Sequence, residues 1–128
     1  MDCLFCKIIN KDIPSETIYE DDKVLVFLDI NPTTNGDSLI IPKKHFKDFR
    51  EVDNETLCHI NDIMKKLYPI YQNKLKCDGL TISHNTDYGQ EIKHFHVHFI
   101  PRYKNDEVKH LSNKEILQDI KEIHESLK

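Results

Sequence analysis

Runs of apolar residues alternate with polar, turn-forming segments along the first part of the chain. The first dozen residues predict a short helix that stops near Pro14, with apolar residues at helical spacing at Leu4, Phe5, Ile8 and Ile9. The segments 23–30 and 38–45 are short and rich in Val, Ile, Leu and Phe, which is typical of strands. The NPTTNGD segment between them has the Pro, Asn and Gly of a turn. We therefore expect two antiparallel strands joined by a long loop.

The rest of the chain continues the alternation with longer helical stretches. Asp53 is placed to cap a helix over 54–73, and Pro69 should kink or end that helix. A strand over 79–85 follows, then the loop TDYGQEI and a strand within KHFHVHFIPR. A Ser-x-x-Glu capping box opens a predicted C-terminal helix over 112–127. The order helix, hairpin, helix, hairpin, helix predicts an α+β fold, a mainly antiparallel sheet with helices packed on it.

Composition narrows the class of protein. The chain has 128 residues and shows no linker or repeat, so we expect one domain over 1–128. Its core should span about 3–104, with a helical extension at 112–127. The net charge of −4, with lysines mixed among acids, argues against a nucleic-acid partner. No secretory signal or bilayer-length apolar run is visible, so we expect a cytoplasmic protein with no membrane partner.

The segment KHFHVHFIPR places His94, His96 and His98 at every second position. On a strand these side chains share one face, and the intervening Phe, Val and Phe share the other. His94 and His98 would then lie about 13 Å apart, too far for both to bind one metal ion. Two interpretations remain: a polar sheet face that happens to carry histidine, or a row of imidazoles for chemistry near neutral pH. In the preceding loop, Asn85, Gly89 and Gln90 offer amide donors and close backbone approach to an anion.

Several segments together resemble one known family. They are CLFCKIINKDIPSETIYEDD, VFLDINPTTNGDSLIIPKKH, ISHN and GQEIKHFHVH. From Cys3 to about Arg102 the chain resembles the histidine triad (HIT) superfamily of nucleotide hydrolases and transferases, closest to its Hint-type and bacterial branches. The resemblance implies a HIT fold, with a five-stranded sheet, a long helix and a C-terminal helix. It also implies a homodimer joined through the 54–73 helix and the strand near 79–85.

The resemblance implies a role for each matching residue. His96 matches the histidine that attacks the α-phosphorus of a nucleotide to form a covalent nucleotidyl-histidine, and a backbone carbonyl is expected to accept its Nδ1–H. His98 matches the histidine that binds a phosphate oxygen. Asp29 matches the acid that accepts hydrogen bonds from the ribose hydroxyls. The other nucleotide-binding positions are Asn85, Gln90 and Glu91 around the phosphate, and Phe5, Ile8, Phe27 and Ile30 in an apolar slot for the base. That slot suggests weak discrimination among purines.

Glu91 departs from the family pattern, because Hint-type phosphoramidases often carry serine there. A carboxylate beside an anionic phosphate is unfavourable unless it turns away or is protonated. The leaving group therefore stays open.

The Cys3-x-x-Cys6 pair is read as metal-binding or redox-active. A tetrahedral zinc site would need two more ligands, and the resemblance points to His45 and His94. A structural Zn²⁺ is thus expected as the cofactor, and His94 would have a task separate from His96 and His98. The alternatives are free thiols in a hydrogen-bond network with the two histidines, or thioredoxin-like redox chemistry.

Three functions are consistent with these residues. The leading hypothesis is a nucleotide hydrolase that cleaves purine nucleoside phosphoramidates or AMP conjugates through nucleotidyl-His96, with a purine nucleotide as its substrate. The second is a dinucleoside polyphosphate hydrolase that uses the same residues. The third is a zinc-stabilised nucleotide-binding module with incidental hydrolysis.

Overall fold

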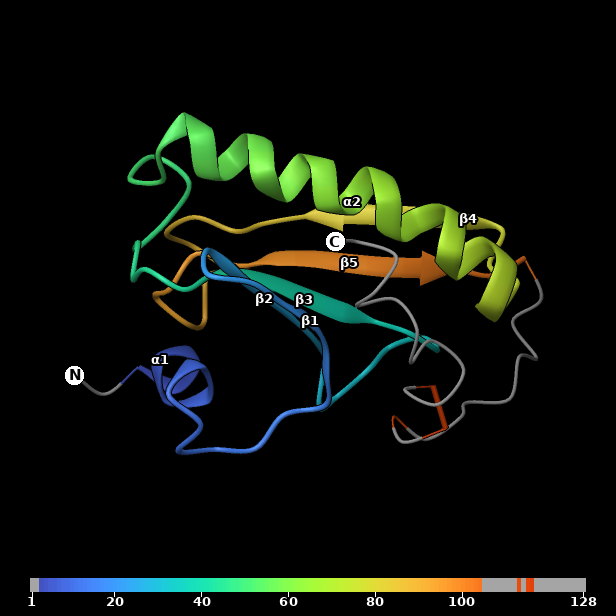
Figure 1. The fold of residues 1–128 in the computed structure, drawn as a ribbon. Helices are drawn as coiled ribbons and strands as arrows, with labels where there is room; N and C mark the ends of the chain where they lie inside the picture. Colours follow the sequence, from blue (N-terminus) through green and yellow to red (C-terminus); the bar gives the residue numbers. More distant parts are fainter. Residues whose placement is uncertain (1–2, 105–112, 114, 117–128) are drawn as a thin grey trace.

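The computed structural model describes residues 3–104, 113, 115 and 116 (Figure 1). Its strands form one five-stranded sheet in the order β1-β2-β3-β5-β4, and all neighbouring strands are antiparallel. The strands are β1 (Thr17–Glu20), β2 (Val24–Leu28), β3 (Ser38–Pro42), β4 (Gly79–Ser83) and β5 (Val97–Arg102). The helices are α1 (Leu4–Ile9) and α2 (Asn54–Leu75). The predicted α+β class and five-stranded HIT fold are confirmed.

The two helices cover opposite faces of the sheet, as Figure 1 shows. Every residue of β2 is buried, which explains its unbroken apolar sequence VLVFL. Val24, Val26 and Leu28 belong to the core under α2, whereas Leu25 and Phe27 belong to the cluster under α1. The α1 side of the sheet is therefore a second, smaller core, and the functional site lies beside it.

Helix α2 is stabilised by an N-cap at its start and by an apolar stripe that packs on the sheet. The Asp53 side chain accepts a hydrogen bond from the Thr56 amide at 3.0 Å, as predicted for the N-cap. Ile60, Ile63, Leu67 and Tyr71 are buried against the sheet. The prediction that Pro69 could end the helix is wrong, since the helix runs on to Leu75. The side chains buried on either side of Pro69 anchor both halves of the helix to the sheet.

The strands differ from the predicted ones mainly at their ends. The predicted strands over 23–30 and 38–45 are shorter in the structure, and β1, with its polar ends, is not among the strands that the hydrophobic pattern predicts. The histidine segment becomes a strand only at Val97, yet the predicted separation of faces holds from His94 onward. The intervening Phe95, Val97 and Phe99 are in the core under α2. The predicted helix over 112–127 falls mostly outside the described residues. No helix among the described residues is long and apolar enough to cross a membrane.

Gly36, in the loop between β2 and β3, has a positive φ of 87°. A side chain is strained in this conformation, so Gly36→Ala is expected to lower the free energy of unfolding by about 1–2 kcal/mol. An added Cβ would also lie 2.5 Å from Leu75 Cδ1. Urea unfolding tests this, with Gly79→Ala as the control, because a Cβ there makes only an ordinary contact with Arg102. Equal destabilisation by the two variants would contradict the expectation.

Candidate active site and metal centre

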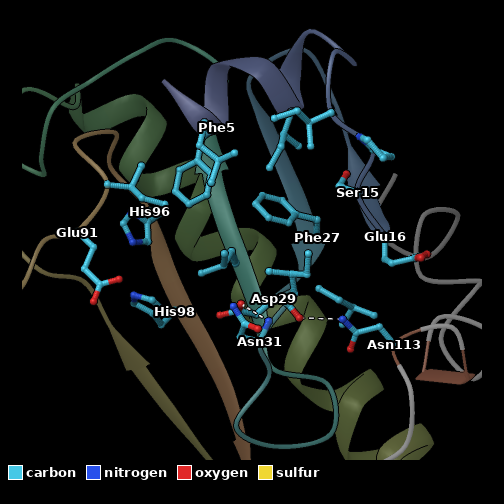
Figure 2. Close-up of a pocket in the computed structure, with 18 of the residues that line it drawn as sticks. Phe5, Ser15, Glu16, Phe27, Asp29, Asn31, Glu91, His96, His98 and Asn113 are labelled. Carbon is cyan, nitrogen blue, oxygen red and sulfur yellow. Dashed lines mark hydrogen bonds between the residues drawn. The ribbon is translucent and has the colours of Figure 1, made fainter. Parts of the chain in front are cut away.

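A cavity of about 740 Å³ lies on the α1 side of the sheet. Its walls come from α1, the end of β2, the start of β5 and the loop that precedes β5 (Figure 2). Phe5, Ile8 and Phe27 line its apolar part, and Asp29, Asn85, Glu91, His96 and His98 also line it. The structure thus brings most of the predicted nucleotide-binding residues to one cavity.

His96 is held in a defined tautomer. Its Nδ1 lies 2.8 Å from the backbone carbonyl oxygen of His94, and because a carbonyl can only accept, Nδ1 carries the proton. The predicted backbone acceptor is thereby confirmed. Nε2 is left with a lone pair, and burial lowers the pKa of His96 below its usual range. Phe5 packs edge-on against the ring, with centroids 5.0 Å apart. The imidazole is therefore neutral and fixed, as a nucleophile requires.

His98 follows His96 by two positions, so its side chain lies on the same face. The centroids of the two imidazole rings are 4.9 Å apart. It is half-buried, lines the cavity and pairs across the sheet with Leu39 and Ser83. Two imidazoles so placed can both contact one phosphate group in the cavity.

Asp29 stands just past the end of β2, where the chain turns into the loop. Its carboxylate Oδ1 accepts a hydrogen bond from the Asn31 amide at 2.9 Å. Its backbone oxygen accepts a 2.8 Å hydrogen bond from the side-chain amide of Asn113, which also lines the cavity (Figure 2). Sequence reasoning missed Asn113, because the residue lies inside the predicted capping box and that motif has a purely structural interpretation.

Only some of the predicted residues in the loop before β5 line the cavity. Asn85 and Glu91 line the cavity, whereas Gln90 is buried outside its lining. The Gln90 amide instead donates a 2.6 Å hydrogen bond to the backbone oxygen of Lys47. The structure therefore does not bring Gln90 into the cavity lining, because its amide N–H is bonded to the neighbouring loop.

The apolar part of the cavity differs in part from the predicted base slot. Phe5 and Phe27 pack edge-to-face, with centroids 5.8 Å apart, and form its apolar wall with Ile8. Ile30 lies at the mouth and is 86% exposed, because it follows the end of β2. The cavity lining also includes three polar residues that the sequence did not predict: Ser15, Glu16 and Asn31.

Four predicted metal ligands converge beneath this cavity: Cys3, Cys6, His45 and His94. One ligand atom from each lies within 4.8 Å of the others. The His94 Nδ1 is 3.4 Å from Cys3 Sγ, and the His45 Nδ1 is 3.3 Å from Cys6 Sγ. The group has the donor types and number of a structural Cys2His2 zinc site.

The orientation of His94 also fits a metal ligand. Its Nε2 donates a hydrogen bond to the Pro42 carbonyl at 2.8 Å, so in the neutral ring Nδ1 carries a lone pair toward the two thiols. Such a fixed outer hydrogen bond is usual for metal-binding histidines. His94 therefore contributes its ring to the cysteine cluster and its backbone oxygen to His96.

A family model described as HIT domain matches residues 10–105. The chain belongs to the HIT domain family. A HIT-like protein of Methanocaldococcus jannaschii is 44% identical over an alignment of 128 positions, which spans 93% of this chain and 98% of the relative. The resemblance inferred from the histidine segment is thereby confirmed.

Two further HIT relatives bear on chemistry. A zinc-bound histidine triad family protein of Mycobacterium smegmatis superposes with a TM-score of 0.82 at 30% identity, over 99% of this chain and 94% of that one. An adenylylsulfatase of Arabidopsis thaliana is 38% identical over 111 residues, which cover 82% of this chain and 54% of that protein. Relatives of this HIT protein thus include a hydrolase and a zinc-bound protein.

Proposed function

We propose that this HIT protein is a hydrolase that cleaves purine nucleoside phosphoramidates or other AMP conjugates at the α-phosphorus, through a covalent nucleotidyl-His96. The observation that carries the proposal is the 2.8 Å hydrogen bond from His96 Nδ1 to the His94 carbonyl. It leaves Nε2 unprotonated in the wall of a cavity large enough for a nucleotide. Covalent catalysis would divide one difficult displacement at phosphorus into two easier ones.

The remaining residues would each bind a different part of the nucleotide. Phe5 and Phe27 would hold the purine between apolar surfaces, and Asp29 would accept hydrogen bonds from the ribose hydroxyls. His98 would donate a hydrogen bond to a nonbridging phosphate oxygen, where charge builds up during the displacement. Asn85 would face the phosphate from the loop between β4 and β5. These assignments rest on the shared cavity and on the match to the family motif.

A structural Zn²⁺ would be held by Cys3, Cys6, His45 and His94. Bound there, it would supply cross-linking between the N-terminal helix and the sheet, with no part in the chemical step. His94 itself holds the His96 tautomer through its backbone oxygen. The zinc-bound relative supports this assignment.

The proposal extends to the setting of the protein, a homodimer in the cytoplasm. Strand β4 is an edge of the sheet, and Ile82 on it is 49% exposed. A second copy would cover this edge, as sheet edges generally require. The free thiols of Cys3 and Cys6 suit a reducing compartment. Light scattering of the purified protein measures the oligomeric state directly, and a monomer would refute this part.

The function is tested by measuring AMP release from an adenosine 5′-phosphoramidate and from a diadenosine polyphosphate. The proposal predicts release from the phosphoramidate. Release from the polyphosphate alone would assign the protein to the polyphosphate hydrolases. Release from neither would leave nucleotide binding as its function.

Asn113→Ala is expected to weaken AMP binding by about three- to tenfold, since the variant loses both the hydrogen bond to Asp29 and a polar part of the cavity wall. Calorimetric titration with AMP measures the effect. Asn73→Ala, at an exposed position of α2, serves as the matched control. An unchanged Kd for Asn113→Ala would remove this residue from the nucleotide site.

A further inference from the structure

Glu91 is an acidic side chain in an unexpected place. It lies in the loop between β4 and β5 and lines the cavity with His96 and His98. Figure 2 shows Glu91 on the same side of the cavity as His96 and His98, opposite Asn113. The ribose-binding end, marked by Asp29, is thus separated from Glu91 by the phosphate position. Glu91 consequently borders the space that the leaving group would occupy.

No cationic side chain among the described residues forms an ion pair with Glu91. The closest lysine in sequence, Lys93, donates instead to the backbone oxygen of Asp87 at 3.3 Å. Arg50 is engaged with Asp48 at 2.7 Å and with Asp87 at 3.6 Å. The Glu91 carboxylate therefore lines the cavity, and no cationic side chain among the described residues pairs with it.

An unpaired carboxylate beside a bound phosphate is repelled by it. A neutral leaving group does not relieve this repulsion, and an anionic leaving group adds a second repulsion. A positive charge on the leaving group would interact favourably with both Glu91 and the phosphate. The leaving group of the substrate would then supply the positive charge that pairs with Glu91.

We propose that Glu91 selects substrates whose leaving group carries a positive charge, such as nucleoside phosphoramidates of diamines or of basic amino acids. The inference rests on the proposed function, and it names the substrate class of the same site. It also separates this chain from its adenylylsulfatase relative, because sulfate is an anionic leaving group.

The reaction balances without any further reactant. His96 Nε2 forms a bond to the α-phosphorus while the phosphorus–nitrogen bond of the substrate breaks, and the amine leaves with that electron pair and takes up a proton. Water then forms the new phosphorus–oxygen bond, the bond to His96 breaks, and the water gives up a proton. Glu91 contacts the ammonium group at the far end of the leaving amine and takes no part in either bond change.

The test uses three adenosine 5′-phosphoramidates that differ only at the end of the amine: 1,4-diaminobutane, pentylamine and 5-aminopentanoate. For the wild-type protein, kcat/KM for the cationic compound is expected to exceed that for the neutral one by about five- to tenfold, with the anionic compound slowest. Glu91→Gln should remove most of the cationic preference, and Glu91→Lys should reverse the order. Asp87→Asn, a neighbouring loop acid outside the cavity lining, should keep the wild-type order.

Equal rates for the three compounds, or an equal loss on all three in Glu91→Gln, would overturn the inference while leaving the hydrolase intact. The second result would instead indicate that Glu91 acts on a step common to all three compounds. Should the protein hydrolyse none of the compounds, the proposed function fails, and binding decides the inference. The Kd values of the three compounds for His96→Ala should then follow the same order, and an identical Kd for all three would contradict it.

Discussion

His96→Ala is expected to lower AMP release from an adenosine phosphoramidate by at least about 10⁴-fold, because it removes the atom that attacks phosphorus. AMP binding should change far less, by about threefold or less, because the base and ribose contacts of Phe5, Phe27 and Asp29 remain. The measurements are kcat/KM and a calorimetric Kd on the same preparations. A loss confined to the chemical step is the signature of a nucleophile.

His84→Ala is the matched control for this experiment. His84 is exposed, packs against Phe49 and Phe95, and is not part of the cavity lining. Its removal should leave AMP release within about twofold of wild type. Comparable losses in both variants would show that His96 acts through general stability, and His96→Ala with wild-type turnover would end the case for covalent catalysis.

The second large effect is expected for His94→Ala, on stability and metal content. The His94 ring is fully buried, lies 3.4 Å from Cys3 Sγ and donates to the Pro42 carbonyl. Its loss leaves a cavity and an unsatisfied carbonyl, with a cost of about 2–5 kcal/mol in the free energy of unfolding. It also removes one of the four proposed zinc ligands, so metal analysis should show little bound zinc. Urea unfolding with metal analysis measures both effects.

His59→Ala is the control for His94→Ala, because His59 lies on α2 and bonds to Asp21 at 2.6 Å, away from the cysteine cluster. It should keep the wild-type zinc content. A strong chelator should lower the Tm of the wild type but not that of His94→Ala. If His94→Ala kept full stability and neither protein contained zinc, the division of tasks between His94 and His96 would be wrong.

The features predicted from the sequence are those that depend on local pattern. Alternation along KHFHVHFIPR correctly separated the histidine face from the face under α2, because side chains on extended backbone point alternately to opposite sides. The cap at Asp53 and the stripe ending in Leu67 likewise located the start of α2. Such signals need no knowledge of distant contacts.

The features that were missed depend on contacts between distant segments. Strand β1 is held by pairing with β2, and its polar ends give no clear pattern of their own. Gln90 turns from the cavity because Lys47, 43 positions away, offers a carbonyl. Asn113 reaches Asp29 across 84 positions. None of these partners could be identified from spacing or residue type alone.

The proposed hydrolysis depends on a covalent bond between His96 and the nucleotide. The most direct test is to mix the protein with an adenosine phosphoramidate, quench within milliseconds, and measure the intact mass and the modified peptide by mass spectrometry. The account predicts an added adenylyl group on His96 that disappears as turnover ends and is absent from His96→Ala. Steady turnover with no adduct on His96 at any quench time would contradict it and indicate direct attack by water.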